Sequence, residues 1–355
     1  MKSTSRAVLL LVCAAACVSA QQVLLQGRFG GEINEQSGLG TTPLIFSWPA
    51  SSIYASFEGA SVNATISALE PAVDSSQYTR FVFYVDQQQV ALEATNPNNT
   101  VINWDATNLG NGTHNLTITK ISEASYGQAT LDALTVGSGG RFLTPVLPDA
   151  FASGRRIQYI GDSYTVGFGN VGGTTNCNAT VCEIHRISGL CYPELDSQNA
   201  AIGWGPLTAA NFRADYQVIA WSGAGLDEYA ATLADGTKMY ETGMPEEDLL
   251  SITPEDTTLF MRQIAADNTS MVTNYSSWTP QIVVLAGGTN DFHSTAPPLE
   301  EWINDIISFI DMINEVYNDP TIIVQVFPLE VQPGIKSEEF RGSQKGQTRA
   351  VHDVS

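Results

Sequence analysis

The stretch that decides the fold of this chain is residues 156–167, RIQYIGDSYTVG. It predicts a short apolar strand that stops at Gly161 and presents Asp162 and Ser163 in the turn that follows. A serine just past the carboxyl end of an α/β strand lies where such folds place their chemistry, in the crevice above the sheet. Taken alone, the stretch is more simply interpreted as a strand that ends in an ordinary polar turn.

Two later stretches that also follow apolar strands favour a chemical role, namely residues 221–223 (WSG) and 288–291 (GTND). Ester hydrolysis through a covalent intermediate needs a nucleophile, a base to deprotonate it, and hydrogen-bond donors for the tetrahedral oxyanion. Ser163 is the candidate nucleophile. Gly223 can bring a backbone N–H close to a substrate because no side chain blocks the approach, and Asn290 can aim a side-chain N–H at the same point.

The region around these stretches, residues 153–328, has the pattern of an α/β domain with a parallel sheet. The candidate strands are mostly continuous apolar runs, as expected for strands covered on both faces. These strands span residues 156–160, 216–221, 281–286 and 321–326, and the candidate helices span residues 204–214 and 299–317.

Residues 22–145 predict a β-sandwich. Short runs alternate apolar and polar residues between turn clusters, with no long helical period. The runs span residues 51–57, 61–66, 80–85 and 114–121. Residues 137–140 (GSGG), followed by Pro145 and Pro148, predict a linker.

Residues 1–20 predict a secretory signal peptide. Lys2 and Arg6 make the start positive, residues 7–16 form an apolar run, and residues 18–20 (VSA) form a small-residue cleavage site. The run is too short to cross a bilayer comfortably, and no later stretch is long enough. A secreted, extracellular glycoprotein also fits the seven Asn-x-Ser/Thr sequons. These are at Asn63, Asn98, Asn111, Asn115, Asn178, Asn268 and Asn274.

The net charge of −21 argues against nucleic acid and anionic membranes as partners, because such a surface repels phosphate groups. After removal of the signal peptide, the cysteines are Cys177, Cys182 and Cys191, an odd number for an oxidising compartment. Cys177 and Cys182 can close a small loop, or either can pair with Cys191. A metal site that uses the nearby His185 is a less favoured alternative.

Two other motifs are weak. Residues 167–172 match Gly-x-Gly-x-x-Gly, but these glycines start several residues after the strand and no helix opens behind them, so we interpret them as a mobile loop beside Ser163. The Gly-x-Ser-x-Gly pattern of α/β-hydrolases is absent around both Ser163 and Ser222.

The triplet of residues 161–163 (GDS), Gly223 and residues 288–291 resemble the first three blocks of the SGNH (GDSL-like) hydrolases. Together with residues 112–120 (GTHNLTITK) at the end of the sandwich, they look like carbohydrate esterase family two. The resemblance implies a jelly-roll-like sandwich followed by a flattened α/β/α domain with a parallel sheet. It also implies removal of O-acetyl groups from plant polysaccharides such as xylan or mannan.

For the site, the resemblance implies Ser163 as the nucleophile, with its own N–H, Gly223 and Asn290 forming the oxyanion hole. It requires no metal or organic cofactor. The expected partner is an acetylated polysaccharide or oligosaccharide, and we expect a monomer. Two alternatives stay open: a non-catalytic polysaccharide-binding protein in which Ser163 is not activated, and an SGNH esterase that acts on another acyl ester.

The base of this family is a histidine near the C-terminus, usually preceded three residues earlier by an aspartate. His352 has the right order in the chain, but Arg349 stands where the aspartate is expected. Of the other histidines, His114 is in the sandwich, His185 is in the cysteine loop, and His293 closely follows Asn290. Residues 329–355 have no apolar period and are locally basic, which predicts a disordered tail. Our hypothesis is a truncated or misread C-terminus, which leaves the SGNH domain incomplete.

Overall fold

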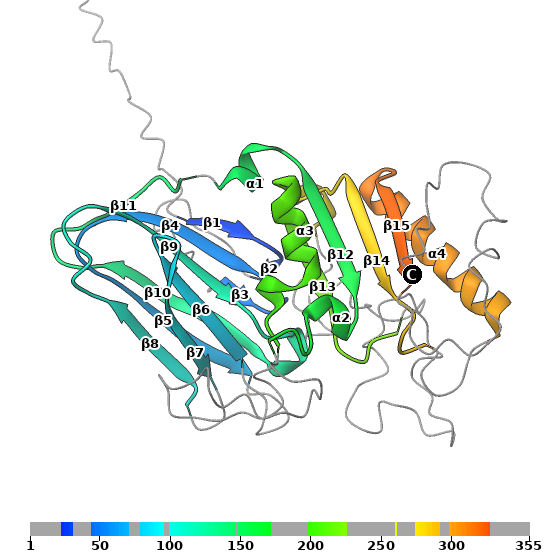
Figure 1. Ribbon diagram of the computed structural model, residues 1–355, viewed down its shortest axis with the longest axis horizontal. Coiled ribbons are helices and arrows are strands. Elements are labelled where there is room, and N and C mark those ends of the chain that lie inside the picture. The colour runs from blue at the N-terminus through cyan, green and yellow to red at the C-terminus, as the bar shows by residue number, and fades with distance from the viewer. Residues whose placement is uncertain are drawn as a thin grey trace, which may run out of the picture.

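The computed structural model describes residues 23–30, 44–70, 79–95, 99–146, 148–171, 198–225, 260, 274–291 and 298–326. Two antiparallel sheets face each other in the N-terminal part, and a parallel sheet flanked by helices follows (Figure 1). This arrangement confirms the predicted fold class.

The sandwich is built from one six-stranded and one five-stranded antiparallel sheet. The first has the order β1 (Val23–Gln26), β4 (Ser52–Glu58), β9 (Thr113–Lys120), β6 (Thr79–Val85) and β7 (Gln88–Thr95), with β11 (Arg141–Leu143) also paired to β4. The second has the order β2 (Phe29–Gly30), β3 (Leu44–Phe46), β10 (Gln128–Val136), β5 (Val62–Glu70) and β8 (Val101–Ala106). All four predicted strand runs are confirmed.

Alternation along the strands builds the sandwich core, because successive side chains of a strand point to opposite faces. On β4, Ile53, Ala55 and Phe57 are buried in the core between the sheets. On the adjacent β9, Leu116 and Ile118 join the same cluster. The side chains that alternate with these on β4 and β9 point away from this core, toward the outer face of the sheet.

Residues 137–140 do not form the predicted linker. They form a tight turn, in which the N–H of Gly140 donates to the carbonyl of Gly137 at 2.9 Å, and the turn leads directly into β11. A Cβ at Gly140 would lie 2.6 Å from the carbonyl oxygen of Glu58, so the chain passes too close to β4 for any side chain. The prediction was wrong because turns and linkers use the same residue types.

The second part contains a four-stranded parallel sheet in the order β13 (Asp215–Ala220), β12 (Arg156–Gly161), β14 (Ile282–Gly287) and β15 (Thr321–Val326). Each strand begins and ends within one residue of its predicted bounds. Helix α1 (Asp149–Ala152) precedes β12, and short helical segments between the strands include α2 (Ser163–Val166), η3 (Ala200–Ile202) and η6 (Tyr275–Ser277). A further short segment, η1 (Ala124–Tyr126), lies between β9 and β10 of the sandwich.

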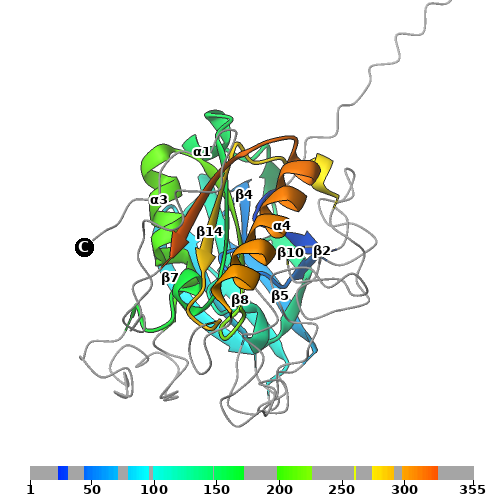
Figure 2. The same ribbon diagram turned by 90° about the vertical axis from the view of Figure 1, so that its right-hand side faces the viewer.

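Two longer helices cover opposite faces of the parallel sheet (Figure 2). Helix α4 (Leu299–Tyr317) has the predicted bounds and buries an apolar stripe that includes Trp302 and Phe309 against one face. Helix α3 (Trp204–Phe212) packs on the other face, against Tyr159. The strands are thus covered on both sides, which explains their continuous apolar sequences.

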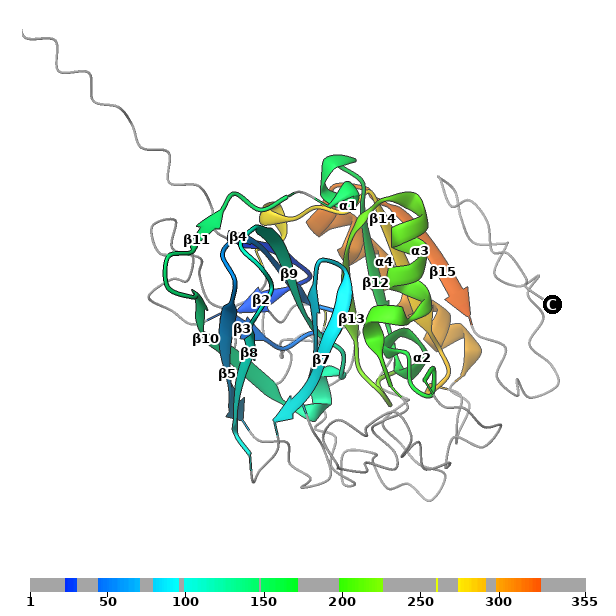
Figure 3. The same cartoon turned by 60° about the vertical axis from the view of Figure 1, so that its left-hand side comes forward.

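The sandwich packs directly beside β13, the edge strand of the parallel sheet (Figure 3). The amide of Gln26 donates to the Asp215 carboxylate at 3.1 Å, and Trp278 Nε1 donates to the other oxygen of that carboxylate at 2.7 Å. Trp48 and Ala124 of the sandwich are buried in the same apolar cluster as α4. The two parts therefore share an apolar cluster besides the sandwich's own core, so the sandwich is packed against the α/β part.

Candidate active site

The three predicted site stretches leave the parallel sheet on the same side, at the carboxyl ends of its strands. Strand β12 is hydrogen-bonded to both β13 and β14, and Gly161 lies opposite Ala220 on one side and Ala286 on the other. Residues after these positions therefore emerge together at the carboxyl ends of three neighbouring strands. The chain passes from β12 to β13 on one side and then crosses back to β14 on the other side of β12, and such a reversal opens a crevice in an α/β sheet.

Ser163 is the first residue of α2 and is half-buried. Asp162 caps this short helix, because its carboxylate accepts the backbone N–H of Tyr164 at 3.0 Å. Gly161 brings the strand end close to β14: a Cβ there would lie 2.4 Å from the carbonyl oxygen of Ala286. The Gly-Asp-Ser order thus has a physical reason at each position, namely close approach, capping and a partly exposed hydroxyl.

Burial raises the pKa of the Asp162 carboxyl to about 6; the N–H of Tyr164 opposes this rise, and the charge of Asp291 adds to it. Asp291 is itself anchored, since Trp302 Nε1 on α4 donates to its carboxylate at 3.0 Å. Two buried carboxyl groups therefore support the loops that carry Ser163 and Asn290. Asp162 contacts the N–H of Tyr164 and the side chain of Thr289, and Asp291 contacts the indole N–H of Trp302, so both carboxyl groups hold these loops in place.

The Asp162 carboxyl predicts a pH dependence of stability. Its folded-state pKa lies above the ordinary 3.8, so the folded protein binds this proton more tightly than the unfolded chain does, and the group costs stability as pH rises from about 4 to about 6. Asp162→Asn keeps an oxygen for the Tyr164 N–H and cannot ionise. We expect the Tm of this variant minus that of the wild type to rise across this window and then to level off.

The exposed Asp311→Asn substitution on α4 controls for the loss of one negative charge at the surface. Thermal unfolding of all three proteins between about pH 4 and pH 8 measures the effect. If the Tm difference between Asp162→Asn and the wild type stays constant with pH, the raised pKa of the Asp162 carboxyl is contradicted.

Gly223 occupies a turn that follows β13. The N–H of Ala224 donates to the carbonyl of Trp221 at 3.2 Å, and Gly223 has a φ of 84°, in the left-handed region that glycine adopts without strain. The N–H of Trp221 donates to the Gly161 carbonyl at 3.1 Å and so extends the pairing of β12 with β13 into the turn. The turn that carries Gly223 is thereby tied to the strand that leads to Ser163.

Asn290 links the third loop to this turn. Its side-chain Nδ2 donates to the carbonyl of Ala224 at 2.8 Å. An amide nitrogen carries two hydrogens, so this bond sets the orientation of the side chain and leaves a second N–H to donate. Ser163, Gly223 and Asn290 thus stand on three loops at one edge of the sheet, and hydrogen bonds join the loops of Gly223 and Asn290.

One residue of the site was missed by the sequence analysis. Glu123, which follows β9 in the sandwich, is buried with 1% of its surface exposed, and its Oε2 accepts the backbone N–H of Ser222 at 2.7 Å. The signal in the sequence is slight: an acidic residue between a strand and a turn normally lies at the surface. The contact depends on packing between the two parts of the chain.

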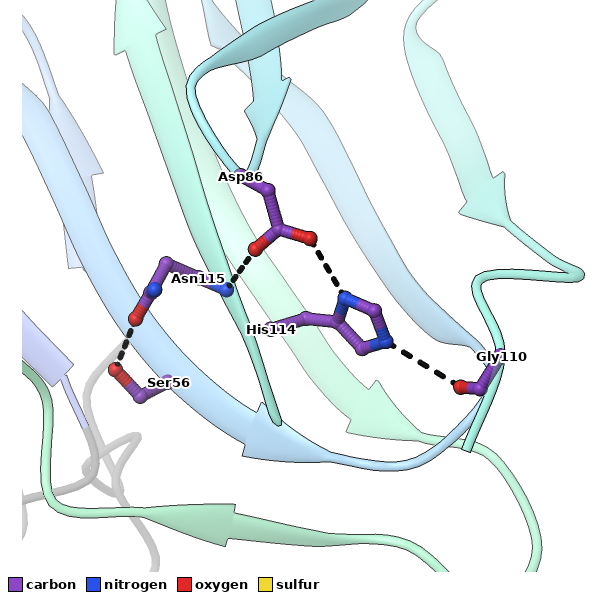
Figure 4. A network of polar contacts seen from close by, with 5 residues as sticks. All are labelled: Ser56, Asp86, Gly110, His114 and Asn115. Carbon is purple, nitrogen blue, oxygen red and sulfur yellow. Dashed lines mark hydrogen bonds and ion pairs between the residues drawn. The ribbon is translucent and has the colours of Figure 1, made fainter. Parts of the chain in front are cut away.

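His114 has a structural role in the sandwich, as the sequence analysis expected of a strand residue. Its Nδ1 lies 2.7 Å from the Asp86 carboxylate and its Nε2 lies 3.3 Å from the Gly110 carbonyl oxygen (Figure 4). The other Asp86 oxygen accepts the N–H of Asn115 at 2.9 Å. The hydrogen bond with Asp86 raises the pKa of His114 above its ordinary value. This network holds the β6–β7 turn against β9.

Several predicted features lie outside the described residues. They include the candidate base His352, with His185, His293, Cys177, Cys182 and Cys191. Of the predicted mobile loop, residues 167–171 are described: Asn170 and Asn199 exchange two hydrogen bonds of 2.8 and 2.9 Å there. Within the described part of the chain, no group of three or more His, Cys, Asp or Glu side chains is placed to hold a metal ion.

Comparison with known proteins shows which esterases the chain resembles. Residues 39–145 match the family model described as carbohydrate esterase 2 N-terminal. The chain is similar to the family two carbohydrate esterases. An acetylxylan esterase / glucomannan deacetylase of Cellvibrio japonicus is 27% identical over 263 residues, which are 72% of this chain and 58% of that relative. Cellulase/esterase CelE of Acetivibrio thermocellus is 25% identical over 282 residues, which are 79% of this chain and 29% of that relative.

The similarity to family two carbohydrate esterases extends to the fold. A structure of such an esterase from Clostridium thermocellum, in complex with cellohexaose, has a TM-score of 0.64 and 22% sequence identity, and the match covers 88% of this chain and 79% of that one. The chain spans less than two thirds of the length of the two curated relatives.

Proposed function

We propose that this chain is a secreted serine esterase that removes O-acetyl groups from plant cell-wall polysaccharides through an acetyl-serine intermediate. The observation that carries the proposal is the convergence of Ser163, Gly223 and Asn290 on loops at one edge of the sheet. A partly exposed hydroxyl beside a glycine turn and a fixed amide is the set of groups that acyl transfer needs.

In the proposed reaction a base takes the hydroxyl proton of Ser163 while Oγ attacks the acetyl carbonyl carbon. The Gly223 N–H, the Asn290 side chain and the N–H of Ser163 itself hold the oxyanion, and each such donor contributes roughly 3 kcal/mol to the transition state. The C–O bond to the sugar then breaks, and the protonated base gives its proton to the sugar oxygen. The base then takes a proton from a water molecule whose oxygen attacks the acetyl-serine carbonyl, and it returns the proton to Ser163 Oγ as the C–Oγ bond breaks and acetate leaves. His352 is the candidate base.

The substrate class is supported by the relatives. The Cellvibrio japonicus relative is named as acting on both xylan and glucomannan, and the Clostridium thermocellum structure holds cellohexaose. A surface with a net charge of −21 fits a neutral, esterified polymer better than an anionic one. We therefore propose acetylated xylan or mannan as the substrate.

Secretion is part of the proposal. It is supported by the pattern of residues 1–20 and by four sequon asparagines that are exposed in the described residues, namely Asn63, Asn111, Asn115 and Asn274. None of the helices in the described residues is long and apolar enough to cross a bilayer.

The proposed function is tested by acetate release from acetylated xylan and from acetylated glucomannan, with the full chain and a heat-inactivated sample. We expect release from at least one polymer, together with single labelling of Ser163 by a fluorophosphonate, read by peptide mass spectrometry. If the folded protein releases no acetate from either polymer and does not react with the probe, the esterase proposal fails.

A second candidate function is carbohydrate binding without turnover. It is favoured by the cellohexaose complex of the similar structure, which shows that this fold can hold a glucan chain in that protein. Calorimetry with cellohexaose separates the two functions. Binding without acetate release would support the binding protein, and acetate release would support the esterase.

A further inference from the structure

In the described part of the chain, the side chain of Glu123 connects the sandwich to the proposed active site. Glu123 Oε2 accepts the N–H of Ser222 at 2.7 Å, a short charge-assisted hydrogen bond, and Ser222 directly precedes Gly223 in the turn after β13. The two residues are 99 positions apart and belong to different parts of the fold.

Glu123 is itself held firmly. The buried Lys120 donates from Nζ to the carbonyl oxygens of Glu123 at 2.6 Å and Ser122 at 2.9 Å. The N–H of Glu123 donates to the side chain of the buried Gln198 at 2.9 Å. The next residue, Ala124, is buried in the cluster that contains Trp221. The backbone that carries the Glu123 side chain is therefore held in place, which fixes the position of its carboxylate relative to the turn.

The bond to Ser222 sets the plane of the peptide that immediately precedes the Ser222–Gly223 peptide. That second peptide carries the Gly223 N–H, the proposed oxyanion donor. Two other hydrogen bonds hold the ends of the turn. The N–H of Trp221 donates to the Gly161 carbonyl, and the Ala224 carbonyl accepts from the Asn290 side chain. Among the described residues, Glu123 makes the hydrogen bond at the centre of the turn. Its loss would let the Trp221–Ser222 peptide, which precedes the peptide of the donor, change orientation.

We propose that Glu123 is a positioning residue for the oxyanion hole, supplied to the α/β part by the sandwich. The inference rests on the proposed function, since it concerns the Gly223 donor of that reaction. A carboxylate near a developing oxyanion does not stabilise it by charge. The contribution of Glu123 therefore comes from geometry, and an uncharged oxygen acceptor at the same place should provide it equally well.

The test compares Glu123→Ala with Glu123→Gln. We expect Glu123→Ala to lower kcat for acetate release by about 10- to 100-fold with little change in KM, because displacement of a reacting group by about 1 Å costs up to roughly 100-fold. Glu123→Gln keeps an acceptor oxygen and should stay within about 3-fold of the wild type, given that geometry alone is at stake. The matched control is Glu58→Ala, which removes an exposed carboxylate of the sandwich that pairs with Arg141.

A second readout does not depend on turnover. Hydrogen exchange of the peptide that contains residues 218–225 should be faster in Glu123→Ala than in the wild type and unchanged in Glu123→Gln. If the wild type is inactive but this exchange pattern holds, the proposed function fails and the positioning contact stands. Equal kcat in folded Glu123→Ala and wild type would overturn the inference, as would a Glu123→Gln variant as impaired as the alanine variant.

Discussion

Ser163→Ala should lower acetate release by about 10⁴-fold or more, because the loss of a catalytic nucleophile removes the covalent route altogether. The side chain is small and half-buried at the start of α2, so its hydroxyl can be deleted without opening a large cavity. We expect an unchanged Tm and an unchanged affinity for cellohexaose if the wild type binds it. Acetate release and calorimetry on the same preparations provide the measurement.

The matched control for this prediction is Ser308→Ala. Ser308 is exposed on α4, where its hydroxyl donates to the carbonyl of Asn304 in the preceding turn, and its loss should leave the activity unchanged. A Ser163→Ala variant with more than about a tenth of wild-type turnover would exclude Ser163 as the nucleophile, since even residual catalysis by the remaining groups is far smaller.

Asn290→Ala should lower kcat by about 10²- to 10³-fold, which is the usual cost of one oxyanion donor. The alanine variant also leaves the Ala224 carbonyl without its 2.8 Å partner, so the turn that carries Gly223 loses one of its ties. Asn290→Asp keeps the shape but replaces the N–H group by a negative oxygen. We expect the aspartate variant to be at least as impaired, because its charge repels the developing oxyanion.

Steady-state kinetics on an acetylated substrate, with Tm as a check on folding, measure these effects. Asn304→Ala, at an exposed position on α4, is the matched control and should behave as the wild type. A decrease of less than about 10-fold in kcat for Asn290→Ala would mean that Asn290 does not serve as an oxyanion donor.

The four parallel strands, four of the sandwich strands and the two long helices could be predicted from sequence because their signals are local. Residues 299–317 carry an apolar stripe with a helical period, and α4 has these bounds. The runs of the parallel sheet are continuous because both faces are covered, and all four strands were found. Where the signal was ambiguous the prediction failed: residues 137–140 contain turn glycines that serve equally well in a linker, and they form a turn beside β4.

The candidate site was predictable in part. Ser163, Gly223 and Asn290 each follow an apolar strand, and parallel strands end at the same edge of their sheet, so the sequence indicated their convergence. The hydrogen bond from Asn290 to Ala224 was not predictable, because it depends on how two loops fold above the sheet. The base stays a prediction, since His352 lies outside the described residues.

By itself the sequence determined the order of the parallel strands and the two long helices, the change from an antiparallel to a parallel part, and the serine, glycine and asparagine at the strand ends. These features depend on periodicity and on local turn chemistry, which neighbouring residues specify. Tertiary structure alone decided that the sandwich shares an apolar cluster with the α/β part and that Glu123 binds the turn of Ser222. Such contacts join residues far apart in the chain, and their geometry follows from packing rather than from any local pattern.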